Sequence, residues 1–419
     1  MSQRLFFLPL AAGLACSLAA ATAYSQEPLT LERAQQLAVN DQPLLQAQSA
    51  GIEAKRARAV AAGQLPDPEV QFAVNELPAN TDDAWSFRRD GDTDVMIGLM
   101  QEYPRAAKRR LRRLREEASA SRSEQDLLEL ARLIRRSTGL AYADVYFNQR
   151  ALDLATQQLA QTQLQQEAAR IRFTTGTGPQ SELLAAGVEA AALRDKVAEY
   201  EQVLAHERIT LSRWIGVAAS GEIPAAMPTP PAPPPLERVL SEVASHPALL
   251  AQEQAKEFAL RGLDLAKQEY KPDWRIELGY GYRPEFSEMV TLRVAVDLPL
   301  FTRNRQDREA AAARQDIQAA AAEFANRARE LAAEAAVAHH NLTRYRERLE
   351  AYREDALPSA RARVEAAESA YRSASGSLAD ALLARRALLD TELQLLTLSV
   401  EALRSRIQLD YYVSEGERQ

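Results

Sequence analysis

Few side chains in this sequence have the types and spacing that chemistry would need. The histidines His206, His246, His339 and His340 are scattered, and the adjacent pair cannot share one helix face as an i,i+4 pair would. The methionines beyond Met1 form no cluster that suggests a copper relay. We find no nucleophile–base pair, phosphate-binding loop or metal-ligand spacing. We therefore expect a protein that is not an enzyme and that has no cofactor and no metal site.

The strongest concentration of charge is a basic run that follows Pro104. It comprises Arg105, Lys108, Arg109, Arg110, Arg112, Arg113 and Arg115. Such a run could belong to a basic zipper that binds DNA, but the chain carries a formal net charge of −7 and starts with an export signal. We expect no nucleic-acid partner and interpret the run as the solvated face of a helix.

Residues 1–25 have the pattern of a bacterial signal peptide. Arg4 supplies the positive start, an apolar stretch follows, and Ala23-Tyr24-Ser25 fits a small-x-small cleavage site. The alternative, a membrane-anchoring helix, is disfavoured because the apolar run is short. The only cysteine, Cys16, lies inside this segment, and Gly13-Leu14-Ala15 lacks the Leu or Val that precedes a lipidated cysteine. We expect an exported chain without disulfides.

The rest of the sequence contains two similar halves. Shifted by 198 residues, "RFTTGTGPQSELL", which starts at Arg172, aligns with "YRSASGSLADALL" so that Phe173 falls on Tyr371. Upstream, "LERAQQLAVNDQPLLQAQ" corresponds to "LERVLSEVASHPALLAQE". We predict a first repeat over 26–216, a Pro-rich extended linker over 217–235 and a second repeat over 236–419.

Each repeat is predicted to contain a short helix, two strands, a long helix and a second short helix, so the fold is mainly α with a small β part. The predicted elements lie near 30–63, 69–76, 94–101, 105–173 and 180–215, and again near 236–270, 274–282, 290–298, 303–372 and 378–412. A long helix of this kind spans about 100 Å, so two short helices end to end would match it. Pro358 should kink or split the second long helix.

The predicted strands alternate between apolar and polar residues. In "WRIELGYGY" Ile276, Leu278 and the tyrosines alternate with Arg275, Glu277 and glycines, while "DVMIGLMQ" in the first repeat is less clear. Segments of eight to ten residues with this pattern suit an outer-membrane β-barrel, although a pair of soluble hairpins packed on helices would show it too. Four strands cannot close a barrel, for which about eight are needed. If the strands cross a membrane, several chains must share one barrel.

With these features the sequence resembles the TolC-like outer-membrane efflux proteins over essentially the whole mature chain. The two aligned stretches around the helix breakers look like the family's hairpin signature, an aromatic residue, then Gly, then Asp-x-Leu. The joins "EYPRAAKRRLRR" and "LPLFTRNRQ" are most similar to the branch that works with heavy-metal exporters of the cobalt-zinc-cadmium type.

The resemblance implies a passive channel in a tripartite efflux system. Its members are homotrimers with a twelve-stranded outer-membrane barrel, four strands from each chain, and a trimeric helical barrel in the periplasm. The expected partners are a periplasmic adaptor protein, an inner-membrane pump of the RND type and outer-membrane lipid, and the expected cargo is metal cations or small toxic compounds. The alternative is a periplasmic coiled-coil structural or adaptor protein without a pore.

The resemblance also implies roles for the two breaker stretches. Gly176, Gly178, Pro179, Ala374 and Gly376 would form hairpin tips at the far periplasmic end, where the adaptor docks.

In the family, acidic side chains near the second hairpin ring a closed aperture. Asp380 matches the first of these, and Glu182 is its counterpart in the first repeat. Ala374 stands where the signature has glycine, and Leu383 stands where a second ring carboxylate is often found. The other interpretation of Asp380 is a helix N-terminal charge favoured by the helix dipole.

Overall fold

The computed structural model describes residues 28–413 except 41, 81, 227–228 and 374. The signal peptide predicted for residues 1–25 and the tip residue Ala374 therefore lie outside the described residues. Within the described part, no helix is long and apolar enough to cross a membrane.

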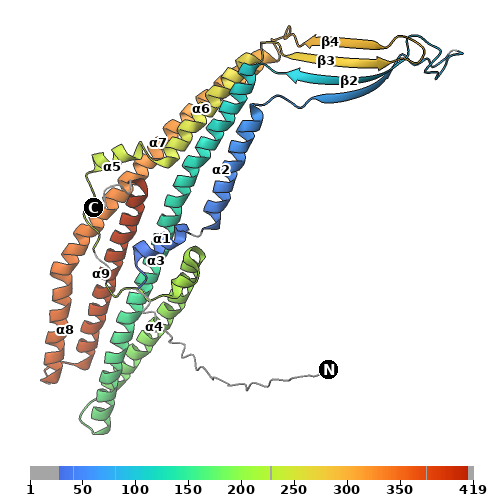
Figure 1. Cartoon of the computed structure of the whole chain (residues 1–419). Helices are drawn as coiled ribbons and strands as arrows, with labels where there is room; N and C mark the ends of the chain where they lie inside the picture. Colours follow the sequence, from blue (N-terminus) through green and yellow to red (C-terminus); the bar gives the residue numbers. More distant parts are fainter. Residues whose placement is uncertain (1–27, 41, 81, 227–228, 374, 414–419) are drawn as a thin grey trace, which may run out of the picture.

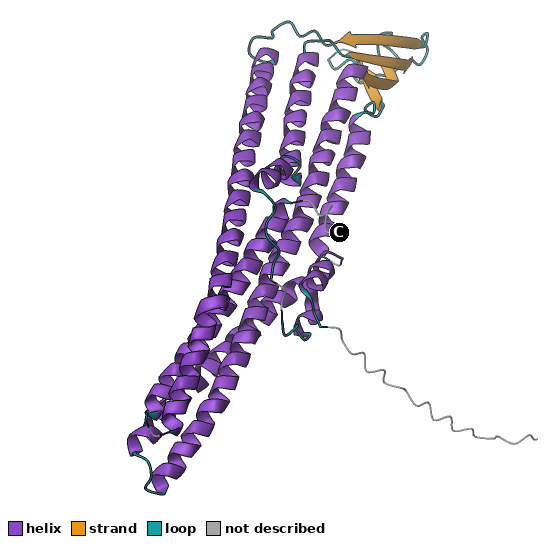
Figure 2. Ribbon diagram, turned by 90° about the vertical axis from the view of Figure 1, so that its left-hand side faces the viewer, coloured by secondary structure: helices purple, strands orange, loops and turns teal. Residues whose placement is uncertain are grey.

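The described chain is mainly helical, with one small sheet at one end of long helices that run side by side (Figures 1 and 2). The first repeat consists of α1 (Leu31–Asn40), α2 (Pro43–Ala62), β1 (Glu69–Asn75), β2 (Asp94–Tyr103), α3 (Ala106–Thr174) and α4 (Gln180–Ile215). The second consists of α5 (Leu236–Val243), α6 (Pro247–Gln268), β3 (Trp274–Tyr282), β4 (Met289–Val296), α7 (Gln306–Ala351), α8 (Leu357–Arg372) and α9 (Leu378–Tyr412). The predicted order of elements is confirmed in both halves.

The predicted first helix of each repeat is wrong in one respect, because each is two helices. The break falls before Pro43 in the first repeat and before Pro247 in the second. Proline has no N–H to donate and its ring clashes with the preceding turn, so it starts a helix more readily than it continues one. The two prolines lie within one position of each other in the aligned sequences, so a break recurs at nearly the same place.

Pro358 interrupts the second long helix, as predicted. A π-helical turn, Tyr352–Ala356, separates α7 from α8, and Pro358 lies in the first turn of α8. The first long helix has no such interruption, and α3 continues for 69 residues, or about 100 Å. The helices α2 and α4 both pack along α3, while α6 and α9 pack along α7 (Figure 1). Two shorter helices thus cover one long helix.

The C-terminal helix α9 joins the two halves because it buries side chains in two cores. Val400, Leu403 and Ile407 pack with α1, α3 and α4 of the first repeat. Leu409 and Tyr411 pack instead with α5, α6 and α7 of the second repeat.

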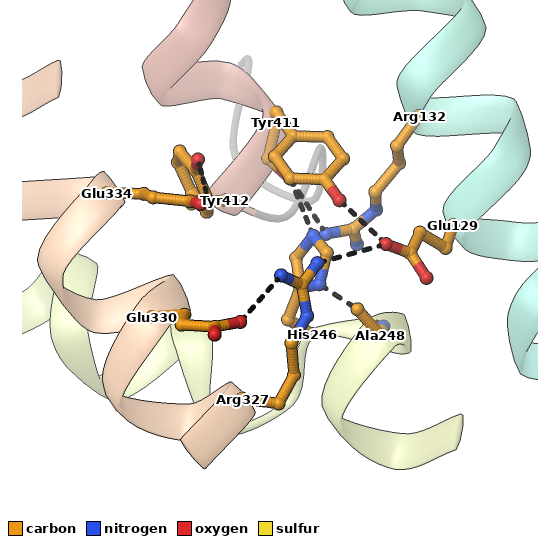
Figure 3. Close-up of polar contacts among 9 residues, drawn as sticks. All are labelled: Glu129, Arg132, His246, Ala248, Arg327, Glu330, Glu334, Tyr411 and Tyr412. Atoms are coloured by element: carbon orange, nitrogen blue, oxygen red, sulfur yellow. Dashed lines mark hydrogen bonds and ion pairs between the residues drawn. The ribbon is translucent and has the colours of Figure 1, made fainter. Parts of the chain in front are cut away.

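The end of α9 is tied to the start of α6 by the buried His246 (Figure 3). The Nδ1 atom of His246 accepts a hydrogen bond from the Ala248 N–H, which caps α6, so Nε2 carries the proton and donates it to the Tyr411 carbonyl at 3.0 Å. Tyr411 Oη donates to Glu129 of α3, and Glu129 is also ion-paired with Arg327 of α7. Elements from both halves therefore meet in one polar cluster.

The linker between the repeats is extended over 229–235 and lies against α7 and the π-helical turn, where Arg353 donates to the Thr229 hydroxyl at 3.1 Å. His339 Nε2 contacts the Pro234 carbonyl at 2.9 Å, and Arg346 donates to the Pro230 carbonyl at 2.9 Å. The start of the predicted linker differs, since Gly216–Ser220 forms a short 3-10 helix. The side chain of His339 thus helps to hold the linker on α7.

The four strands form one antiparallel sheet in the order β1-β2-β3-β4. The central pair joins the two repeats, since β2 pairs with β3 in a register that places Leu99 opposite Leu278. The strands β1 and β4 are the two edges, and neither has a further strand beside it within the described chain.

Candidate functional site

The reversal between α3 and α4 is a tight turn that depends on two glycines. The N–H groups of Thr177 and Gly178 both donate to the Arg172 carbonyl, at 2.9 and 3.1 Å, which satisfies the end of α3. Gly176 has a φ of 71°, in the left-handed region that favours glycine. A Cβ on Gly178 would lie 2.9 Å from the Cβ of Arg172. Pro179 then precedes the first residue of α4.

The reversal between α8 and α9 has the same backbone hydrogen bonds, displaced by the offset seen in the sequence. The N–H groups of Ser375 and Gly376 both donate to the Ala370 carbonyl, at 2.9 and 3.0 Å. Ser377 takes the place of Pro179 and caps α9, because its hydroxyl accepts from the Asp380 N–H at 3.1 Å. The two turns therefore share the same backbone hydrogen bonds, but only α9 has a side-chain cap at its first turn.

Asp380 is exposed and completes the cap of α9. Its Oδ2 atom accepts hydrogen bonds from the Ser377 hydroxyl at 2.7 Å and from the Ser377 N–H at 3.4 Å. This is a capping box, which also places the carboxylate near the positive end of the helix dipole. The helix N-terminal role that the sequence left open is present, and the exposed carboxylate can still attract a cation.

Glu182 has a different environment from Asp380, although the two align in the repeats. Its side chain is 16% exposed and is ion-paired with Arg172 at 3.3 Å. Pro179 has no hydroxyl that could donate to Glu182 as Ser377 donates to Asp380. The Glu182 carboxylate is paired with Arg172 instead. The structure does not bring Glu182 and Asp380 into contact within one chain.

Arg172, Glu182 and Tyr371 form a polar bridge between the two hairpins. The hydroxyl of Tyr371 donates to Glu182 Oε2 at 3.4 Å and accepts from the guanidinium of Arg172, which also lies over the tyrosine ring, 5.1 Å from its centroid. Beneath the bridge, Ala169 and Ala186 of the first hairpin pack with Leu378 and Leu382 of the second. We call this set of three residues the tip bridge.

The sequence did not identify Arg172 or Tyr371 as functional residues. Both occur in the aligned stretches, where Tyr371 corresponds to Phe173. That substitution of a phenol for a phenyl ring was the one available signal, since it adds a hydrogen-bonding group at an otherwise apolar position.

One face of the sheet exposes apolar side chains on every strand. They are Val70, Phe72 and Val74 of β1, Val95, Ile97 and Leu99 of β2, Ile276, Leu278, Tyr280 and Tyr282 of β3, and Val290, Leu292, Val294 and Val296 of β4. The strand registers align these positions across the sheet. The alternation of β2, which is unclear from the sequence, is therefore the same as in the other strands, with exposed apolar residues at every second position.

The opposite face of the sheet carries polar and small residues together with Met96, Met100 and Met289. Glu277 is ion-paired with Arg293 at 2.8 Å, and Glu102 with Arg275 at 3.0 Å. Such pairs suit a surface that faces water, whereas the apolar face would be costly to expose to it.

The basic run after Pro104 is not simply a solvated face, which corrects the interpretation of one of its members. Lys108 is 3% exposed, and its ammonium group is ion-paired with Glu269 at 3.0 Å and Asp273 at 2.6 Å. The start of α3 packs along α6, which brings these carboxylates to the lysine. Lys108 therefore ties the first repeat to the second.

Comparisons with known proteins agree with this architecture. Residues 241–413 match the model of the outer membrane efflux protein family. The outer membrane protein VceC from Vibrio cholerae matches with a TM-score of 0.76 at 17% identity, covering 91% of this chain and 95% of that one. The CmeC outer membrane channel of Campylobacter jejuni matches with a TM-score of 0.78 at 13% identity, covering 98% and 93%. The chain has the TolC-like outer-membrane efflux fold.

The resemblance to the TolC-like efflux proteins is therefore confirmed at the level of the fold. CusC, whose structures concern transmembrane channel formation, matches this efflux fold with a TM-score of 0.75 at 15% identity, covering 92% of each chain. No curated protein sequence matches the chain. The family description places its members in the outer membrane, which agrees with the expected localisation, and the matched proteins are described as outer-membrane proteins or channels rather than enzymes.

Proposed function

We propose that the protein is a passive channel subunit of a tripartite efflux system in the bacterial outer membrane. The observation that carries the proposal is the apolar face of the sheet, which continues across all four strands at one end of the helices. Apolar residues on one face and ion pairs on the other suit strands that contact lipid outside and water inside. The long helices would then extend into the periplasm.

The open edges of the sheet support a homotrimer. The strands β1 and β4 each present unpaired backbone groups, and a membrane tolerates no such edge. Four strands are too few to close a barrel, for which about eight are needed. Three copies joined edge to edge would give a twelve-stranded barrel with three sets of helices beneath it.

The alternative is a periplasmic coiled-coil structural or adaptor protein without a pore. Long packed helices alone would fit either function. The alternative gives no reason for an apolar sheet face that is exposed on every strand, so we favour the channel.

The test is to extract the full-length protein from outer membranes in detergent and measure its oligomeric state and its conductance in planar bilayers. We expect a trimer that conducts ions. A water-soluble periplasmic monomer with no conductance would refute the channel and support the structural alternative.

We further propose that the tips form the periplasmic gate, with Asp380 at the opening and Glu182 in the bridge that holds it shut. In a trimer, three exposed Asp380 carboxylates around a narrow opening would attract cations. The tip bridge ties the first hairpin to the second through Glu182, so it resists movement of one hairpin away from the other.

The gate role of Asp380 can be separated from its capping role by a matched pair of variants. Asp380→Asn removes the charge but keeps an oxygen that can accept the capping bonds, and Ser377→Ala weakens the cap but keeps the charge. We expect the preference for cations over anions to fall in Asp380→Asn and to persist in Ser377→Ala. Unchanged selectivity in Asp380→Asn would leave Asp380 with a structural role only.

The tips themselves are the proposed docking site of the periplasmic adaptor, formed by Gly176, Gly178, Pro179 and Gly376 with the neighbouring Ala374. Their small side chains leave the backbone of each turn open to a partner. An inner-membrane pump of the RND type would supply the energy. We propose metal cations or small toxic compounds as cargo, and export assays with the pump genes deleted one at a time would distinguish them.

A further inference from the structure

The exposed apolar surface does not end with the sheet. Beyond Val296, the last residue of β4, three more apolar side chains are exposed: Leu298 at 63%, Leu300 at 73% and Phe301 at 86%. Trp274 lies beside this end of the surface, since it pairs with Val296. The apolar face therefore reaches the join between β4 and α7, at the end of the sheet nearest the helices (Figure 1).

Three exposed arginines follow immediately where the apolar residues stop. Arg303, Arg305 and Arg308 are all exposed, and within the described part of the chain none of their guanidinium groups has a hydrogen-bond or ion-pair partner. The adjacent carboxylate of Asp307 is already engaged, because it accepts hydrogen bonds from Tyr270 at 2.7 Å and Thr302 at 3.4 Å.

At the corresponding join of the first repeat, three of the basic residues make internal contacts. Lys108 is buried in its two ion pairs, Arg105 donates to the Pro272 carbonyl at 3.1 Å, and Arg109 donates to the Pro104 and Gly63 carbonyls. These side chains hold the base of the sheet together. Arg303, Arg305 and Arg308 make no such contacts, although they follow β4 just as the basic run follows β2 in the first repeat.

We propose that the segment from Leu298 to Arg308 binds the headgroups of anionic phospholipids in the periplasmic leaflet. Leu298, Leu300 and Phe301 contact the acyl chains, and the planar guanidinium groups below them donate paired hydrogen bonds to lipid phosphates. Long arginine side chains at the edge of an apolar band reach the headgroup layer readily. The proposal rests on insertion of the sheet in the membrane, as proposed above.

Trp274 provides a built-in probe for the test, because it is exposed on the apolar face next to this segment. The full-length protein carrying Trp85→Phe is reconstituted in vesicles of phosphatidylcholine and phosphatidylglycerol, one or the other brominated. Trp214, partly buried against the helical core, lies away from the lipid. Quenching of Trp274 by each brominated lipid gives the relative affinity of that lipid for the adjoining surface.

We expect a preference of about tenfold for phosphatidylglycerol. One arginine near an anionic surface strengthens binding about fivefold, and salt screens much of the combined attraction of the three arginines. The preference should approach unity in Arg303→Gln/Arg305→Gln/Arg308→Gln. It should persist in the control Arg329→Gln/Arg344→Gln/Arg363→Gln, which removes three exposed arginines from α7 and α8. The preference of the unmodified segment for phosphatidylglycerol should also weaken at high salt.

The outcomes separate this inference from the channel proposal. If neither brominated lipid quenches Trp274, the sheet is outside the bilayer and the channel proposal fails with it. If both lipids quench Trp274 equally in the unmodified segment, the lipid proposal alone is refuted. If the triple variant dissociates the trimer on native gels without changing the lipid preference, the arginines contact a second copy of the chain, which also refutes it.

Discussion

Replacing Tyr371 with phenylalanine removes the hydroxyl at the centre of the tip bridge and leaves the ring under Arg172. The hydroxyl bonds two charged groups, and hydrogen bonds of this kind contribute about 1.5–3 kcal/mol each when shielded from solvent. The side chain of Arg172 is 39% exposed, so solvent weakens both bonds. We estimate a combined loss of about 1.4 kcal/mol, which corresponds to about a tenfold shift in an equilibrium between closed and open tips.

The assay is single-channel recording of the reconstituted protein, with open probability as the readout. We expect Tyr371→Phe to open about tenfold more often per chain if the bridge exists only in the closed form. Tyr345→Phe is the matched control, because Tyr345 is partly buried in the helical core far from the tips. Equal open probabilities in the unmodified protein and Tyr371→Phe would show that the bridge does not hold the gate.

Three further predictions concern stability, measured by urea unfolding in detergent. Burial, aided by Arg132, lowers the pKa of His246 to about 4, below its unfolded value of 6.5, so the contribution of His246 to stability should fall by about 3 kcal/mol as the pH drops from 6.5 to 4; a His246→Asn variant with an equally steep loss over this range would contradict this. Ser377→Ala should cost about 1 kcal/mol through the lost cap of α9, and no loss would show that the Asp380 cap is dispensable. Lys108→Met should cost about 2 kcal/mol, of which Lys108→Met/Asp273→Asn should recover a part, because removing the buried lysine leaves the Asp273 carboxylate without its ion pair; additive losses would argue against the pairing.

The local elements were predictable because each has a periodicity that is visible without neighbours. The alternation in "WRIELGYGY" marked β3, and the long stretch without proline marked α3. Even the split of the first helices was accessible in principle, since Pro43 and Pro247 were in the aligned stretches. The sequence on both sides of each proline has a helical pattern, and only the missing N–H of the proline indicates the break.

The sequence could not predict contacts between residues that are far apart in the chain. Lys108 seemed to belong to a solvated basic face, and only the packing of α6 on α3 brought Glu269 and Asp273 to it. The same holds for the tip bridge, whose Arg172 and Tyr371 are separated by 199 positions. Partners of this kind depend on the angle and register of packed helices, which no local pattern encodes.

The sequence by itself thus determined the duplication, the order of helices and strands, and the two-sided character of the strands, because these depend on residue periodicity and on the conformational limits of glycine and proline. Only the tertiary structure decided that all four strands join one sheet with a single continuous apolar face. It also decided that the aligned acids differ, with Asp380 capping a helix and Glu182 bridging two hairpins. Each depends on which groups from distant parts of the chain come within hydrogen-bonding distance.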